Sequence, residues 1–140
     1  MTAANTSPIF TLTPNIGIAT VAAANTESDG TGDLVTLLTA GAQGSRVERI
    51  RYGNAQSSAA ASSAMVVRFF ITDTGGANPT LLAEVAVPAI TRTVAVIGAS
   101  GIYTFTGGLT IPAGTIIKVI QSVYAGVQDL MHYVAEGGNF

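Results

Sequence analysis

Closely spaced turn signals divide this chain into runs that are too short for ordinary helices. Glycine-containing turn sequences occur at "SDGTGD" (28–33), "AGAQG" (40–44), "TDTGGANP" (72–79), "GASG" (98–101), "TGG" (106–108) and "PAG" (112–114). The runs between them are rich in threonine, valine and isoleucine, which favour strands. Several short strands between such turns predict an all-β fold, either a sandwich or a barrel.

The predicted strands cover 33–39, 65–73, 80–87, 92–98, 102–108, the residues after Pro112 in 109–123, and 130–136. The runs 92–98 and 102–108 are expected to pair as a hairpin across "ASG". The run after Pro112 is apolar on both faces, which predicts a central strand that is covered on both sides.

The last run contains His132, the only histidine of the chain. In a strand, Met131 and Tyr133 would lie on one face and His132 and Val134 on the other. Both faces contain apolar residues, so we expect cover from the core and from a sister subunit or a neighbouring sheet. The glycine pair after this run is expected to release the chain from the sheet.

The predicted organisation is one β-sandwich domain over 16–140, preceded by an N-terminal arm over 1–15, since a chain of 140 residues is one domain by ordinary priors. The arm is expected to be flexible or to become ordered against a neighbour. The segment 53–64, "GNAQSSAAASSA", has few large side chains and is expected to be a loop or an edge.

Charge is scarce in this chain. Charged residues make up 10% of the sequence, against about 25% in an average soluble domain. The net charge is −2 and no basic run stands out, which argues against a nucleic-acid partner. No run approaches the length of a membrane span, so no membrane partner is expected. A surface with so little charge suggests that other protein covers much of it.

Enzymatic activity is not expected. The sequence contains no G-x-S-x-G or other nucleophile motif for which His132 could act as the base. A metal site of cupin type would need more than one histidine. An enzyme of cupin or lyase type is therefore disfavoured, and no cofactor is predicted. The acidic turn with Glu27, Asp29 and Asp33 leaves calcium open, although such a turn is more often simply solvated.

Four segments resemble small structural proteins of tailed bacteriophages. They are "GSRVERIRYGNAQSSAAASSAMVVRFFITD", "PTLLAEVAVPA", "LTIPAGTIIKVIQS" and the ending "MHYVAEGGNF", within residues 44–140. The resemblance implies a virion component of the head decoration (cement) family, with a β-sandwich of jelly-roll type. Such a protein would be a homotrimer on the outer surface of an icosahedral capsid, made in the host cytoplasm, and would bridge major capsid protein subunits without catalysis.

Candidate contact residues follow from this function. The apolar arm would reach the capsid or a sister subunit, and its expected anchors are Ile9, Phe10, Leu12 and Ile16. The basic residues Arg46, Arg49 and Arg51 would pair with acidic groups of a partner, and Phe140 would be a terminal anchor.

A second function class is a tail-associated or receptor-binding module of a phage. It would share the sandwich, but its loops should carry aromatic or charged binding residues. The loop 72–79 has Asp73 and Asn78 and no aromatic residue, which favours the decoration protein over this alternative.

Overall fold

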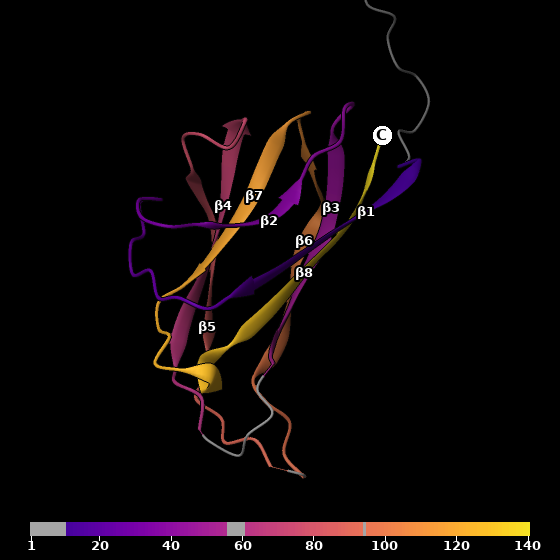
Figure 1. Ribbon diagram of the computed structural model, residues 1–140. Helices are drawn as coiled ribbons and strands as arrows, with labels where there is room; N and C mark the ends of the chain where they lie inside the picture. The colour runs from indigo at the N-terminus through magenta and orange to yellow at the C-terminus, as the bar shows by residue number, and fades with distance from the viewer. Residues whose placement is uncertain (1–10, 56–60, 94) are drawn as a thin grey trace, which may run out of the picture.

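The computed structural model describes residues 11–55, 61–93 and 95–140, which form eight strands and one 3-10 helix (Figure 1). The elements are β1 (Thr13–Val21), β2 (Val35–Thr39), β3 (Ser45–Asn54), β4 (Met65–Thr74), β5 (Thr80–Val87), β6 (Ser100–Ile111), β7 (Thr115–Gln121), η1 (Val127–Asp129) and β8 (Met131–Asn139). The strands build two antiparallel four-stranded sheets. The predicted all-β sandwich is confirmed.

The two halves of the chain are interleaved in both sheets. Sheet A has the order β1-β8-β3-β6, and sheet B has the order β2-β7-β4-β5. The first strand pairs with the eighth, the second with the seventh, the third with the sixth and the fourth with the fifth. Strands β3 and β8 join two of these pairs in sheet A, and β4 and β7 join the other two in sheet B. Neither sheet is therefore complete until both halves of the chain are present.

The hydrophobic core lies between the sheets. Phe69 of β4 and Tyr133 of β8 are fully buried, and their rings meet edge to face with centroids 6.2 Å apart. The prediction for the strand after Pro112 is confirmed, because β7 lies between β2 and β4, its Ile117 and Val119 are fully buried on the inner face, and Ile120 is 1% exposed on the outer face. The inner face of the last strand is confirmed too, since Met131 and Ala135 are buried beside Tyr133.

Strand β3 contains a bulge that turns its arginines outward. Val47 and Ile50 are both buried, although three positions separate them and simple alternation would put them on opposite faces. The pairing of β3 shifts between Val47 and Arg49 against both β6 and β8, so Glu48 is the extra residue. Beyond this bulge Arg49 and Arg51 point away from the core.

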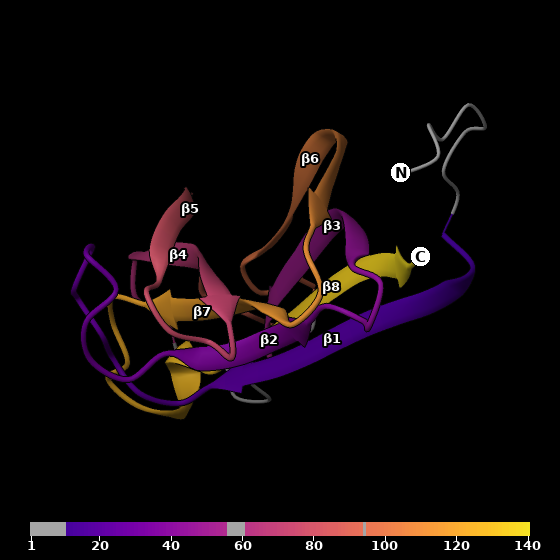
Figure 2. The same cartoon turned by 90° about the horizontal axis from the view of Figure 1, so that it is seen from above.

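Strand β6 makes a larger excursion opposite the same bulge. Its pairing with β3 passes from Thr104 directly to Leu109, and the residues 105–108 rise out of the sheet (Figure 2). Gly107 and Gly108 both have left-handed backbones, with φ of 78° and 77°. The Arg46 side chain holds this excursion, because its Nη2 donates a 2.8 Å hydrogen bond to the Gly107 carbonyl.

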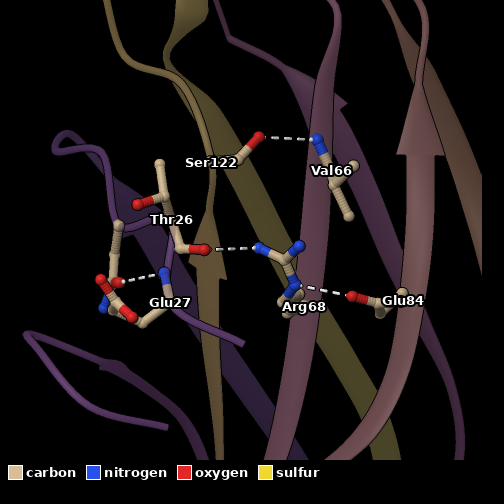
Figure 3. A network of polar contacts seen from close by, with 7 residues as sticks. Thr26, Glu27, Val66, Arg68, Glu84 and Ser122 are labelled. Atoms are coloured by element: carbon tan, nitrogen blue, oxygen red, sulfur yellow. Dashed lines mark hydrogen bonds and ion pairs between the residues drawn. The ribbon is translucent and has the colours of Figure 1, made fainter. Parts of the chain in front are cut away.

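The outer face of sheet B is covered by the loop that joins β1 to β2. Phe70 and Ile120 belong to this face, yet they are only 0% and 1% exposed. Arg68 lies beside them, and it donates a 3.3 Å hydrogen bond to the Thr26 carbonyl and a 2.6 Å one to Glu84 (Figure 3). We call residues 22–34 the covering loop.

A buried polar network closes one end of the sandwich. The Asp129 carboxylate is fully buried and accepts hydrogen bonds from the Ser63 amide at 2.7 Å, the Ser63 hydroxyl at 3.1 Å and the Ala125 amide at 2.8 Å. Gln121 donates to the Asp129 carbonyl and accepts from the Tyr133 hydroxyl. Burial raises the pKa of Tyr133, so its hydroxyl keeps the proton that it donates. Through Ser63, this network links the segment 53–64, which has few large side chains, to the core.

The two ends of the described chain meet in a second polar cluster. Asn139 accepts hydrogen bonds from Asn15 at 2.8 Å and from the buried Ser45 hydroxyl at 2.5 Å. The expectation that the glycine pair releases the chain is wrong, because Gly137 and Gly138 pair with both β1 and β3. A side chain at Gly137 would overlap the carbonyl of Arg46, so close packing of strands explains the glycine there.

Two further expectations differ from the structure. The strand at 92–98 and its hairpin are wrong, because the described residues of this segment are in no strand and β6 pairs with β3 instead. Ile97 is 76% exposed, so the apolar alternation of this run does not reach the core. Strand β1 begins at Thr13, and it therefore takes in the last three residues of the segment 1–15 that was assigned to an arm.

Candidate functional site

The outer face of sheet A is uncovered by the described residues, and we call it the bare face. It consists of alternating positions on all four strands. Its side chains are Ile16, Ile18 and Thr20 of β1, His132, Val134 and Glu136 of β8, Arg49 and Arg51 of β3, and Ile102 and Thr104 of β6. Strand register places these residues in rows across the sheet, with Ile18, Val134, Arg51 and Ile102 in one row.

Large apolar side chains on the bare face are exposed to solvent. Ile18 is 71% exposed, Ile102 is 55% exposed and Ile16 is 52% exposed. They occur at both edges of the sheet, and Val134 lies between them in a partly buried position. Grouped apolar residues of this kind mark interaction surfaces more often than isolated ones do.

A cluster of three charges occupies the centre of the bare face. Glu136 pairs with Arg49 and also with Arg51, whose Nε lies 2.7 Å from the Glu136 carboxylate. The hydrogen bond from Arg49 is the main reason that the pKa of Glu136 is lowered, and the charge of Arg51 contributes as well. Both arginines pair with the same Glu136 carboxylate, so the cluster keeps one net positive charge. This charge suits an acidic partner.

The third predicted arginine lies at the rim of the same surface. Arg46 pairs with Glu48 across 2.7 Å and, as described above, binds the excursion of β6. A hollow beside the charge cluster is lined by Thr11, Ile16, Arg46, Glu48, Arg49, Glu136, Gly137 and Gly138. The structure thus brings three predicted contact residues, Ile16, Arg46 and Arg49, around one depression.

The other predicted contact residues are dispersed. Ile9 and Phe10 lie outside the described residues. The Leu12 side chain is 81% exposed, and its amide extends the pairing of β1 by donating to the Asn139 carbonyl. Phe140 is partly buried beside Gly44, whose carbonyl accepts a hydrogen bond from the Phe140 amide. Neither residue belongs to the bare face.

His132 is placed on the bare face as a sheet residue. Its Nδ1 lies 2.8 Å from the Thr20 hydroxyl of the neighbouring strand. This pairing accounts for the polar side chain at a position next to apolar ones.

The acidic turn lies on the covering loop. Asp29 accepts hydrogen bonds from the Thr31 amide at 3.0 Å and the Thr31 hydroxyl at 2.7 Å. These bonds lower the pKa of Asp29, the one to the hydroxyl most strongly. Among the described residues, no three histidine, cysteine or acidic side chains come together as a metal site would require.

Sequence reasoning missed Ile18, Ile102 and Glu136, whereas it placed Val134 with His132 on one face of the last strand. The signal for Ile18 was present, because Ile16 and Ile18 have the two-residue spacing of one strand face in "NIGIATV". Glu136 could not be assigned to the arginines, because the pairing of β3 with β8 brings residues together that are 87 positions apart.

Comparisons with known proteins give no family. No protein-family model matches the chain, and a search of curated proteins found no match. None of the described helical segments is long and apolar enough to span a membrane. The bare face and the resemblance of residues 44–140 to phage structural proteins are therefore the two indications of function.

Proposed function

We propose that this protein is a non-enzymatic virion component that decorates and stabilises an icosahedral phage capsid. The observation that carries the proposal is the bare face, where exposed isoleucines at both edges of the sheet flank a central charge cluster. A rigid sheet with such a surface is suited to binding other protein, since its backbone needs no ordering on contact. The resemblance of residues 44–140 to phage structural proteins supplies the kind of assembly.

We also take the sandwich to be of jelly-roll type. The pairing of first with eighth, second with seventh, third with sixth and fourth with fifth strand supports it. This is the pattern that a long antiparallel hairpin gives when it is rolled into two facing sheets, as in jelly rolls. The fold is one of those used by viral capsid components, which agrees with the proposed location on the capsid.

Stabilisation would come from many repeated weak contacts. A decoration protein on the outer surface of the capsid would bridge major capsid protein subunits, so that opening the shell requires breaking the added contacts as well. As a homotrimer it would bind several subunits at once, and linked contacts raise the overall affinity without strengthening any single one.

The start of the chain would provide the capsid contact. Leu12 is highly exposed at the beginning of sheet A, and the apolar residues Ile9 and Phe10 precede it in the sequence. Deleting residues 1–12 would remove these three side chains and leave Asn15 in its cluster with Ser45 and Asn139. A deletion that reached residue 15 would damage the fold as well and would be harder to interpret.

Purified virus particles that carry this gene provide the test. Mass spectrometry should find the protein in intact particles, and antibodies against it should label the outside of the head. Particles that lack the protein should rebind the purified full chain but not the 1–12 deletion, while circular dichroism shows both to be folded. Absence from particles would overturn the proposal, and labelling of the tail would favour the tail-associated module.

A further inference from the structure

We infer that the bare face binds a second copy of this chain, head to tail, through the covering loop of that copy. The inference deepens the proposed function and rests on it, because it assigns one of the contacts by which such a protein assembles. It concerns the partner of the bare face and leaves the number of copies open.

The apolar part of the bare face favours a protein partner. Ile18, Val134 and Ile102 occupy one row of the sheet, and only Arg51 interrupts them. On the matching face of sheet B, Phe70 and Ile120 are covered by the chain itself, and Leu81 at the edge is 41% exposed. Contact with another protein would remove the isoleucines from water in the same way.

Charge indicates which surface of the second copy is bound. Three of the six basic residues and two of the eight acidic residues lie on or beside the bare face, which gives it one net positive charge. The whole chain has a net charge of −2, so the rest of it carries −3. Two bare faces would repel each other, whereas a bare face and an acidic surface attract.

The covering loop provides the acidic surface. Its Glu27, Asp29 and Asp33 are all exposed, and the hydrogen bonds from Thr31 fix the orientation of the Asp29 carboxylate. The exposed small residues Ala22, Ala23 and Ala24 precede them. A surface of small apolar side chains beside carboxylates complements isoleucines beside arginines.

The two surfaces lie on opposite sides of the sandwich. One is the outer face of sheet A, and the other covers the outer face of sheet B. A contact between different surfaces of identical chains is heterologous, and its repetition gives a closed ring or an extended row. The binding of one copy therefore leaves a free bare face or a free loop for the next.

Sedimentation velocity of the purified full chain tests the inference over a range of concentrations and two salt concentrations. The wild type should self-associate, less strongly at high salt. Arg51→Glu and Glu27→Lys should each raise the concentration needed for association by about tenfold or more. The double variant Arg51→Glu/Glu27→Lys restores opposite charges across the contact and should recover most of the association.

Controls separate this result from general charge effects. Asp73→Lys makes the same charge change as Glu27→Lys at the end of β4, outside the covering loop, and should leave association unchanged. Ile102→Ser tests the apolar part without changing charge, which matters because Arg51→Glu also places a carboxylate beside Glu136. A monomeric wild type, a double variant no better than the single ones, or an equal effect of Asp73→Lys would overturn the inference. A self-associating chain that is absent from virus particles would instead overturn only the proposed function.

Discussion

Phe70 on sheet B and Ile18 on sheet A both point away from the core, but only Phe70 is covered by its own chain. The covering loop passes over sheet B, where Arg68 binds Thr26 (Figure 3). Pro79 lies against Gly30 of the same loop. On sheet A the described residues leave Ile18 mostly in solvent. The contrast shows that an outward apolar residue such as Phe70 contributes to folding where the chain covers it, whereas Ile18 remains available for contact.

Truncating Phe70 should produce the largest effect on folding. Phe70→Ala removes a fully buried ring and should cost about 3–5 kcal/mol of unfolding free energy. Ile18→Ala, on the bare face, should change stability by no more than about 0.5 kcal/mol. Urea denaturation of both variants, at concentrations where the protein is monomeric, gives the comparison. Equal losses would mean that the bare face also contributes to the fold.

Detaching the covering loop should have an intermediate effect. Gly30 has a φ of 86°, and a side chain there would come within 2.6 Å of Pro79, so Gly30→Ala combines backbone strain with a clash. We expect a loss of about 2–3 kcal/mol. Gly75 is the matched control, since its φ is 90° but its surroundings are open. Gly75→Ala should cost about 1 kcal/mol of unfolding free energy. Thermal unfolding of both glycine variants and the wild type gives the comparison.

The charge cluster of the bare face should have the smallest effect, and that effect should depend on pH. The pKa of Glu136 is lowered in the folded protein from its ordinary value of 4.5, chiefly by Arg49. The pairing of Glu136 with the arginines therefore stabilises the fold at pH values above the ordinary pKa. This stabilisation is lost as the pH falls through the lowered pKa. The stability difference between wild type and Glu136→Gln should be greatest near neutral pH and shrink in acid. Denaturation midpoints measured across this range check it, and a constant difference would contradict the pairing.

Much of the fold could be predicted from the sequence because several strands follow the alternation rule. Met65, Val67 and Phe69 of β4 and Met131, Tyr133 and Ala135 of β8 lie inward at every second position, so their patterns match their burial. In β5 the alternation fails at Leu81, which is 41% exposed where the pairing with β4 shifts. β1 does the reverse, with Gly17 and Ala19 inside and Ile16 and Ile18 outside. Gly17 is required there because a side chain would overlap the Leu37 carbonyl of β2. A strand that packs closely through small residues does not show the usual pattern.

The candidate site could be predicted only in part, for a related reason. The sequence indicates Ile16 as an anchor of the apolar arm, and Arg49 and Arg51 as part of a basic group. Their common face depends on the bulge at Glu48 and on the register of β3 with β8. These features arise from contacts between distant parts of the chain, so neither local pattern nor composition reports them. The covering loop is likewise an outcome of packing that no motif indicates.

The pairing of β1 with β8 has a consequence for the order of events during synthesis. β8 lies between β1 and β3, so β1 has no place in sheet A until the residues 131–139 have been made. During translation β1 would thus remain unpaired, with its isoleucines exposed, until almost all of the remaining chain has been made. Pairing over such sequence distances slows folding, and the unpaired strand is open to wrong partners during that delay. A chain that stops short of β8 would lose the neighbour of its first strand as well as its last strand.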